Sequence, residues 1–134
     1  MTDSRTVIER YVAAVEKRDM DTVRDLFAED ATWWLGGELP LSGTWRGRDA
    51  ILGDFLGSIP RLYQPETISI EVTSLLAEGE VVALEWTSRA LTVAGEPYEN
   101  QCAGVFTVRE GRIVAVREYM DTQYAAAKFA AISA

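Results

Sequence analysis

The chain contains no histidine and a single cysteine, Cys102. Without these side chains, the usual ligand sets for zinc, copper and haem cannot be assembled within one chain, and only carboxylate sites for hard cations remain. Metal catalysis is therefore not expected. One cysteine also excludes an intramolecular disulfide, and its place in a strand-like run favours core packing over a reactive thiol.

Basic residues are few, because 13 Lys and Arg stand against 21 Asp and Glu, for a formal net charge of -8. Phosphate backbones and anionic lipids would be repelled, so we expect neither nucleic acid nor a membrane surface as a partner. No apolar run approaches the roughly 18 residues that span a bilayer, and the first residues lack the segments of a signal peptide. These absences predict a cytoplasmic protein.

What is present suits one globular domain over residues 1–134, with 48% hydrophobic residues. Apolar residues recur at helical spacing between Val7 and Val15 and again between Met20 and Phe27, which predicts a helical hairpin. Asp19 or Asp21 can cap its second helix. A third helix is predicted to start near residues 48–49 and to stop around Pro60.

The second half of the chain changes to alternation of apolar and polar residues. This period predicts four strands, over about 68–72, 80–93, 98–109 and 112–121. The short separators each contain a glycine, so neighbouring strands should form antiparallel hairpins. A short aromatic strand over 31–35 and a C-terminal helix over 122–134 complete an α+β fold.

This order of elements resembles the nuclear transport factor 2-like superfamily, in particular its SnoaL-like branch of ketosteroid isomerases, polyketide cyclases and limonene epoxide hydrolases. The runs similar to the opening of the isomerases are Arg10–Ala14, Asp19–Asp21 and Leu26–Thr32. Those similar to the closing strands of the epoxide hydrolases are Gly104–Phe106, Glu110–Ile113 and Arg117–Asp121. The resemblance implies a cone-shaped, curved antiparallel or mixed sheet around three N-terminal helices, an internal pocket for a small, largely apolar molecule, and a homodimer.

The resemblance also places an acid/base carboxylate at Asp121, at the end of the last strand. Burial in an apolar cavity would favour its protonated form and suit it to proton transfer near neutral pH. The alternative is a structural Asp121 that bonds a nearby backbone group or an arginine. Alternation puts Glu85, Thr87 and Arg89 on one face of their strand and Tyr119 beside Asp121, and the resemblance turns both sets toward the cavity. Arg89 would then neutralise one carboxylate and position the other; the alternative is a structural salt bridge.

Comparison with the enzymes of this superfamily is uneven. Tyr11 matches the tyrosine on the first helix of the isomerases, but the position of their base falls at Leu35. Of the catalytic residues of the epoxide hydrolases, only the one at Asp121 has a counterpart. The SnoaL-like cyclases need mainly one Asp, so this sequence differs least from them. The expected ligand contacts, with core packing as the alternative for the apolar ones, are Trp33, Leu35, Phe55, Ile59, Thr87, Asn100 and Tyr119.

Three functions stay open at this point. The first is a cofactor-free acid/base enzyme of the cyclase, isomerase or epoxide hydrolase type, with Asp121 as the proton-transfer residue and Arg89, Glu85 and Tyr11 assisting. The second is a non-catalytic module that binds an apolar metabolite. The third is a dimeric scaffold or a protein-binding domain that uses Leu84, Trp86 and the sheet surface, with the cavity filled by tryptophan side chains. Leu84 and Trp86 would form a bulky outer face, which a second copy would cover.

Overall fold

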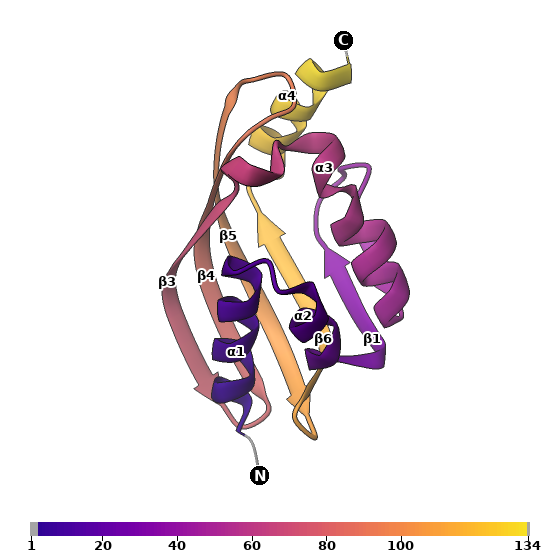
Figure 1. Cartoon of the computed structure of the whole chain (residues 1–134), viewed down its shortest axis with the longest axis vertical. Helices are drawn as coiled ribbons and strands as arrows, with labels where there is room; N and C mark the ends of the chain where they lie inside the picture. Colours follow the sequence, from indigo (N-terminus) through magenta and orange to yellow (C-terminus); the bar gives the residue numbers. More distant parts are fainter. Residues whose placement is uncertain (1–2, 134) are drawn as a thin grey trace.

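Two short helices open the chain in the computed structural model, which describes residues 3–133 (Figure 1). Helix α1 (Ser4–Glu16) begins where the Asp3 side chain accepts the Thr6 N–H at 2.7 Å. Helix α2 (Met20–Leu26) begins in the same way at Asp19, which accepts the Thr22 N–H at 3.2 Å. The predicted helical hairpin is confirmed, and Asp19 rather than Asp21 is its second cap.

Among the described residues 3–133, six strands form one mixed sheet in the order β2-β1-β6-β5-β4-β3. Their bounds are β1 (Phe27–Leu35), β2 (Gly43–Arg46), β3 (Ser69–Glu78), β4 (Val81–Leu91), β5 (Pro97–Arg109) and β6 (Arg112–Met120). Strands β3 to β6 pair antiparallel as predicted. β1 is longer than expected and pairs parallel with β6. β2 was not predicted, because Pro40 before it and Gly43 at its start are typical of a loop.

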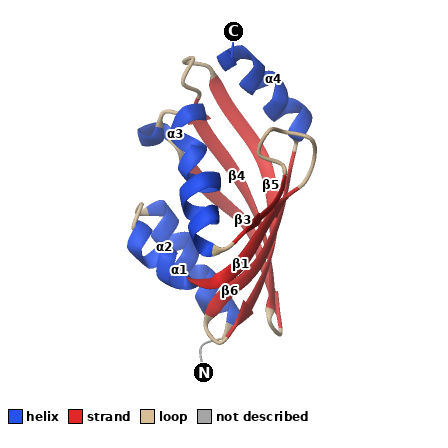
Figure 2. Cartoon of the chain, turned by 90° about the vertical axis from the view of Figure 1, so that its right-hand side faces the viewer, coloured by secondary structure: helices blue, strands red, loops and turns tan. Residues whose placement is uncertain are grey.

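The sheet is curled, and α1, α2 and an irregular helical segment cover one of its faces (Figure 2). That segment comprises the π-helical turn η1 (Ala50–Phe55), the 3-10 turn η2 (Leu56–Ser58) and the α-helical turn α3 (Ile59–Leu62). The predicted start near residues 48–49 is confirmed, and the segment ends at Leu62, shortly after the predicted stop around Pro60. Pro60 lies in the first turn of α3, where its missing N–H costs no helical hydrogen bond, and the helical path continues to Leu62.

The two elements not yet described lie toward the end of the domain opposite the N-terminus (Figure 1). They are the 3-10 turn η3 (Pro65–Thr67) and the C-terminal helix α4 (Thr122–Ser133), which was predicted. Within residues 3–133, no helix is both long enough and apolar enough to cross a membrane.

The core lies between the helices and the concave face of the sheet. Leu84 and Trp86 of β4 are buried there, so the prediction of a bulky outer face formed by these two residues is wrong. Gly104 of β5 makes room for them: a Cβ atom at this position would lie 2.8 Å from the Phe106 ring and 3.1 Å from the Trp86 ring.

Candidate functional site

A carboxyl group lies in the apolar interior, on the concave side of β6. It belongs to Glu118, whose residue is only 8% exposed. The indole Nε1–H of Trp33, itself 3% exposed, donates to Glu118 Oε1 at 3.0 Å. Burial raises the pKa of Glu118 to about 7, and the Trp33 hydrogen bond opposes that rise only in part. Near neutral pH this group is therefore able both to accept and to donate a proton.

The sheet itself brings Trp33 and Glu118 together, although they are 85 residues apart. In the parallel pairing of β1 with β6, Trp33 stands beside Val116, and Leu35 stands beside Glu118. The Gly36 N–H extends this ladder by donating to the Glu118 carbonyl oxygen at 3.1 Å. Backbone pairing thus fixes both side chains on the same face of the sheet.

Tyr11 of α1 closes the site from the helical side. Its ring packs against Phe27 and Phe106, with centroids 5.8 and 5.5 Å apart. Burial, and then the nearby Glu118 carboxylate, raise the pKa of Tyr11 well above its usual value. Its hydroxyl therefore stays protonated and can act as a hydrogen-bond donor.

A second polar group of the interior is the amide of Asn100 on β5, which is 2% exposed. Its Nδ2 donates to the Tyr98 hydroxyl at 2.8 Å and to the Asp121 carbonyl at 3.0 Å, and its Oδ1 accepts the Asp121 N–H at 3.1 Å. Asn100 thus anchors the backbone at the end of β6. Beside it, burial raises the pKa of the Cys102 thiol to about 12.

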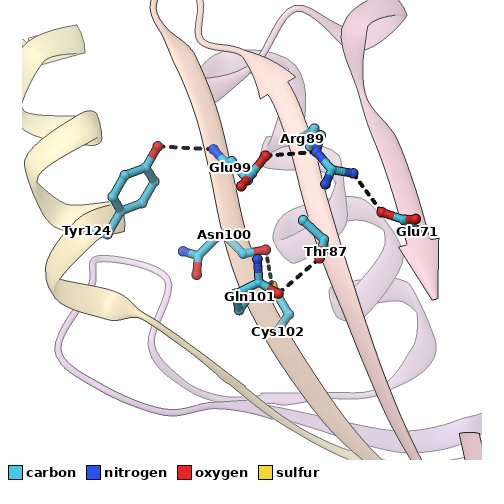
Figure 3. A network of polar contacts seen from close by, with 8 residues as sticks. All are labelled: Glu71, Thr87, Arg89, Glu99, Asn100, Gln101, Cys102 and Tyr124. Carbon is cyan, nitrogen blue, oxygen red and sulfur yellow. Dashed lines mark hydrogen bonds and ion pairs between the residues drawn. The ribbon is translucent and has the colours of Figure 1, made fainter. Parts of the chain in front are cut away.

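Three predicted site residues of β4 lie on the outer face, so their expected placement in the cavity is wrong. Glu85 and Arg89 are exposed, and Arg89 donates to Glu71 and Glu99 at 2.9 and 2.8 Å (Figure 3). Thr87 is buried, but its hydroxyl donates to Gln101 of the outer face at 2.9 Å. The physical reason is that the alternating apolar residues of β4 take the inner face and leave the charged ones in water.

Asp121 and Tyr119 also lie outside the interior. Asp121 follows β6, is exposed, and accepts the Tyr124 N–H on its Oδ1 at 3.0 Å, which makes it a cap of α4. The expected burial of its carboxylate is therefore wrong. Tyr119 is 45% exposed and packs edge-on against Trp34 with a centroid distance of 5.2 Å.

The remaining predicted contacts fall on or near the concave side. Trp33, Leu35 and Phe55 are buried in the core, and Ile59 is half-buried. Sequence reasoning missed Glu118, although a signal was present. On β6 it shares a face with Val116 and Met120, so alternation makes it a charged residue in an otherwise apolar stripe.

Aromatic rings fill the space around this site. Trp33 contacts Phe27, Phe55 and Phe106 with centroid distances of 6.1, 5.5 and 6.3 Å, and Phe55 also contacts Trp45 at 5.5 Å. The interior is thus packed in this state, and the predicted internal pocket stays a prediction.

Two hollows lie elsewhere on the described surface, and neither is lined by Glu118. One of ≈ 450 Å³ lies between the start of β1 and the β5–β6 turn. The other, of ≈ 250 Å³, is lined by Glu85, Gln101, Cys102, Ala103, Tyr119 and Met120. Among residues 3–133, no cluster of three or more cysteine and carboxylate side chains is arranged to hold a metal ion.

Comparison with known proteins extends over nearly the whole chain. A family model described as the SnoaL-like domain matches residues 8–116. An NTF2-like protein from Burkholderia thailandensis is 20% identical with a TM-score of 0.87, and the alignment covers 96% of this chain and 98% of that one. An NTF2-like protein from Burkholderia xenovorans is 26% identical with a TM-score of 0.75, over the same shares of the two chains.

A third solved structure, from Bacillus subtilis, is of a protein provisionally described as an isomerase. It is 21% identical with a TM-score of 0.76, and the alignment covers 95% of this chain and 92% of that one. No curated protein matches the sequence.

Proposed function

The chain belongs to the SnoaL-like domain family, and from that premise we propose that it binds a small, largely apolar molecule and moves a proton on it without a cofactor. The observation that carries this proposal is the buried Glu118 carboxyl group, whose pKa is about 7. An acid/base catalyst is most effective when its pKa lies near the working pH. A carboxyl group held in an apolar interior only for packing would instead destabilise the fold.

The proposed chemistry is of the isomerase or cyclase type. Ionised Glu118 removes a proton from a carbon next to a carbonyl group. The electron pair of that C–H bond forms a carbon–carbon double bond, and the π pair of the carbonyl group moves to its oxygen. The Tyr11 hydroxyl, which stays protonated, donates a hydrogen bond to the resulting oxyanion. In an isomerisation, Glu118 then returns the proton to another carbon of the enolate system. In an aldol ring closure, the enolate carbon attacks a second carbonyl carbon of the substrate, the π pair of that carbonyl moves to its oxygen, and Glu118 returns the proton to this alkoxide.

Glu118 takes the place of Asp121 in this proposal, and the two residues can be separated by experiment. Turnover of a panel of cyclisable polyketide esters and enones would be followed by chromatography with mass detection. We expect Glu118→Gln to lower turnover by about 10²–10⁴-fold, the usual contribution of a general base. Asp121→Asn keeps a side chain that can cap α4, so it should retain turnover. The reverse pattern would restore Asp121 as the acid/base residue, supported by Arg89 and Glu85, and would refute our assignment.

The packed interior favours one second candidate, a binding module without catalysis. Glu118 is only 8% exposed, and the Trp33 ring that binds it packs against Phe55 and Phe106, so the carboxyl group is poorly accessible to a ligand in this structure. Binding of panel compounds without conversion, unaffected by either substitution, would support this function.

We also propose a homodimer, formed through the outer face of the sheet. Leu76 of β3, Ala83 of β4 and Val105 of β5 stand opposite one another there, and Leu76 is 69% exposed. Exposed Val81 and Tyr119 extend the same face. Small and flat side chains of this kind allow two sheets to pack face to face. Sedimentation equilibrium should give twice the chain mass, and Ala83→Glu should return it to the mass of one chain.

A further inference from the structure

We infer that Trp33 is a positioning residue for Glu118: its indole N–H engages Oε1 and leaves Oε2 as the oxygen that exchanges the proton. The inference deepens the proposed function and rests on it for the chemistry. Its structural part, the coupling of the two side chains, can be tested without any substrate.

The geometry of the pair is fixed from both sides. Trp33 Nε1 lies 3.0 Å from Glu118 Oε1, and parallel pairing of β1 with β6 sets the spacing of the two backbones. The Trp33 ring is held by Phe27, Phe55 and Phe106. The N–H therefore meets the carboxyl group in one orientation.

The chemistry of the donor distinguishes the two oxygens. An indole N–H donates but never accepts a hydrogen bond. A carboxylate or carbonyl oxygen accepts this hydrogen bond better than a carboxylic hydroxyl oxygen, so the N–H favours the forms of Glu118 in which Oε1 carries no proton. When Glu118 is protonated, the hydrogen resides on Oε2, and proton transfer in both directions takes place at that atom.

The hydrogen bond from Trp33 to Glu118 could also serve only to satisfy the N–H of a buried tryptophan. Two other tryptophans of the chain are matched controls for this structural explanation. Trp45 donates to the Leu41 carbonyl at 2.9 Å, and Trp86 donates to the Ser88 hydroxyl at 3.0 Å. Neither acceptor ionises near neutral pH. Their indole N–H groups are thus satisfied without being coupled to a titration.

Other titratable groups near Glu118 do not interfere between pH 5 and 9. Those that interact with its carboxylate are Tyr11 of α1, Tyr63 at the end of α3, and Cys102 of β5. Burial raises the pKa of each: Cys102 to about 12, and both tyrosines well above their usual value. All three stay neutral in this range, so a titration seen there in the interior is assigned to Glu118.

The first experiment is a pH titration of the indole N–H signals of the ¹⁵N-labelled wild-type protein by NMR. We expect the Trp33 signal to move with one midpoint near pH 7, while the Trp45 and Trp86 signals stay in place. Glu118→Gln should abolish the Trp33 titration. If the Glu118 carboxyl carbon titrates near pH 7 while the Trp33 signal stays still, our inference is overturned and the proposed function survives.

The second experiment removes the donor and keeps an aromatic ring. We expect Trp33→Phe to raise the pKa of Glu118 by about one unit, as the loss of a hydrogen bond to a charged group implies, and Trp45→Phe to leave it unchanged. The pH profile of turnover should move in the same direction. An unchanged Glu118 titration in Trp33→Phe would refute the positioning role of Trp33 and leave the proposed function standing. A Glu118 midpoint below pH 5 in the wild-type protein would refute both the positioning role and the proposed function.

Discussion

Replacing Glu118 by glutamine should make the protein more stable at pH 8 and change its stability little at pH 4. The pKa of Glu118 rises from 4.5 to about 7 on folding, so the folded state binds the proton more tightly than the unfolded state. Its contribution to stability is fully present below pH 4.5 and is lost as the pH rises through about 7. The glutamine side chain of the variant would be a neutral group of the same shape that still accepts the Trp33 N–H.

The magnitude follows from the size of the shift. Between pH 4.5 and 7 the unfolded chain is ionised while the folded one is protonated, so the free energy of unfolding falls by about 1.4 kcal/mol per pH unit. Over this window the loss amounts to about 3 kcal/mol. This is a large share of the roughly 5–15 kcal/mol that is usual for a domain.

Urea unfolding at half-unit steps from about pH 4 to 9 would measure the effect. The free energies of wild type and Glu118→Gln should diverge by about 3 kcal/mol across the series. Glu85→Gln makes the same substitution at an exposed outer position, and it should run parallel to the wild type. Parallel curves for Glu118→Gln would show that the carboxyl group is solvated in both states and would refute the assignment of a buried acid.

Three further outcomes follow from the packing and the hydrogen bonds. Gly104→Ala should destabilise the protein by about 1–3 kcal/mol, because the new methyl group meets Phe106 and Trp86. Gly53→Ala places its methyl group in open space and should not destabilise the protein. Urea unfolding of both variants checks this difference. Cys102, with its pKa raised to about 12, should react with iodoacetamide about a thousandfold more slowly at pH 8 when folded than in denaturant; equal rates would contradict its burial. Asp121→Ala should cost about 1 kcal/mol through loss of the α4 cap, and Asp121→Asn much less; an equal loss in both would show that the cap is not what matters.

The elements defined by local patterns could be predicted well from the sequence. Helical spacing in α1 and alternation in β3 to β6 are properties of adjacent residues, and the short glycine turns allow one pairing of neighbouring strands. The pairing of β1 with β6 has no such local signal. Nothing near Trp33 in the sequence indicates that its partner lies 85 residues away.

The errors on β4 have a different origin. Alternation along the strand was predicted correctly, but the face was chosen by analogy with related enzymes, which turned Glu85 and Arg89 inward. The hydrophobicity of Leu84 and Trp86 indicates the opposite face, and the structure follows it. Applied to β6, the same physical rule would have singled out Glu118, because Val116 and Met120 require that face to be buried.

The parallel pairing of β1 with β6 also bears on when the interior carboxyl group can become buried during synthesis of the chain. Residues 27–35 are synthesised long before residues 112–120. The edge of β1 that pairs with β6 therefore stays unpaired until most of the chain has been made. Closing so distant a contact is slow compared with forming a hairpin. Trp33 can therefore meet Glu118 only after β6 has been made, and in the unfolded chain the carboxyl group is hydrated.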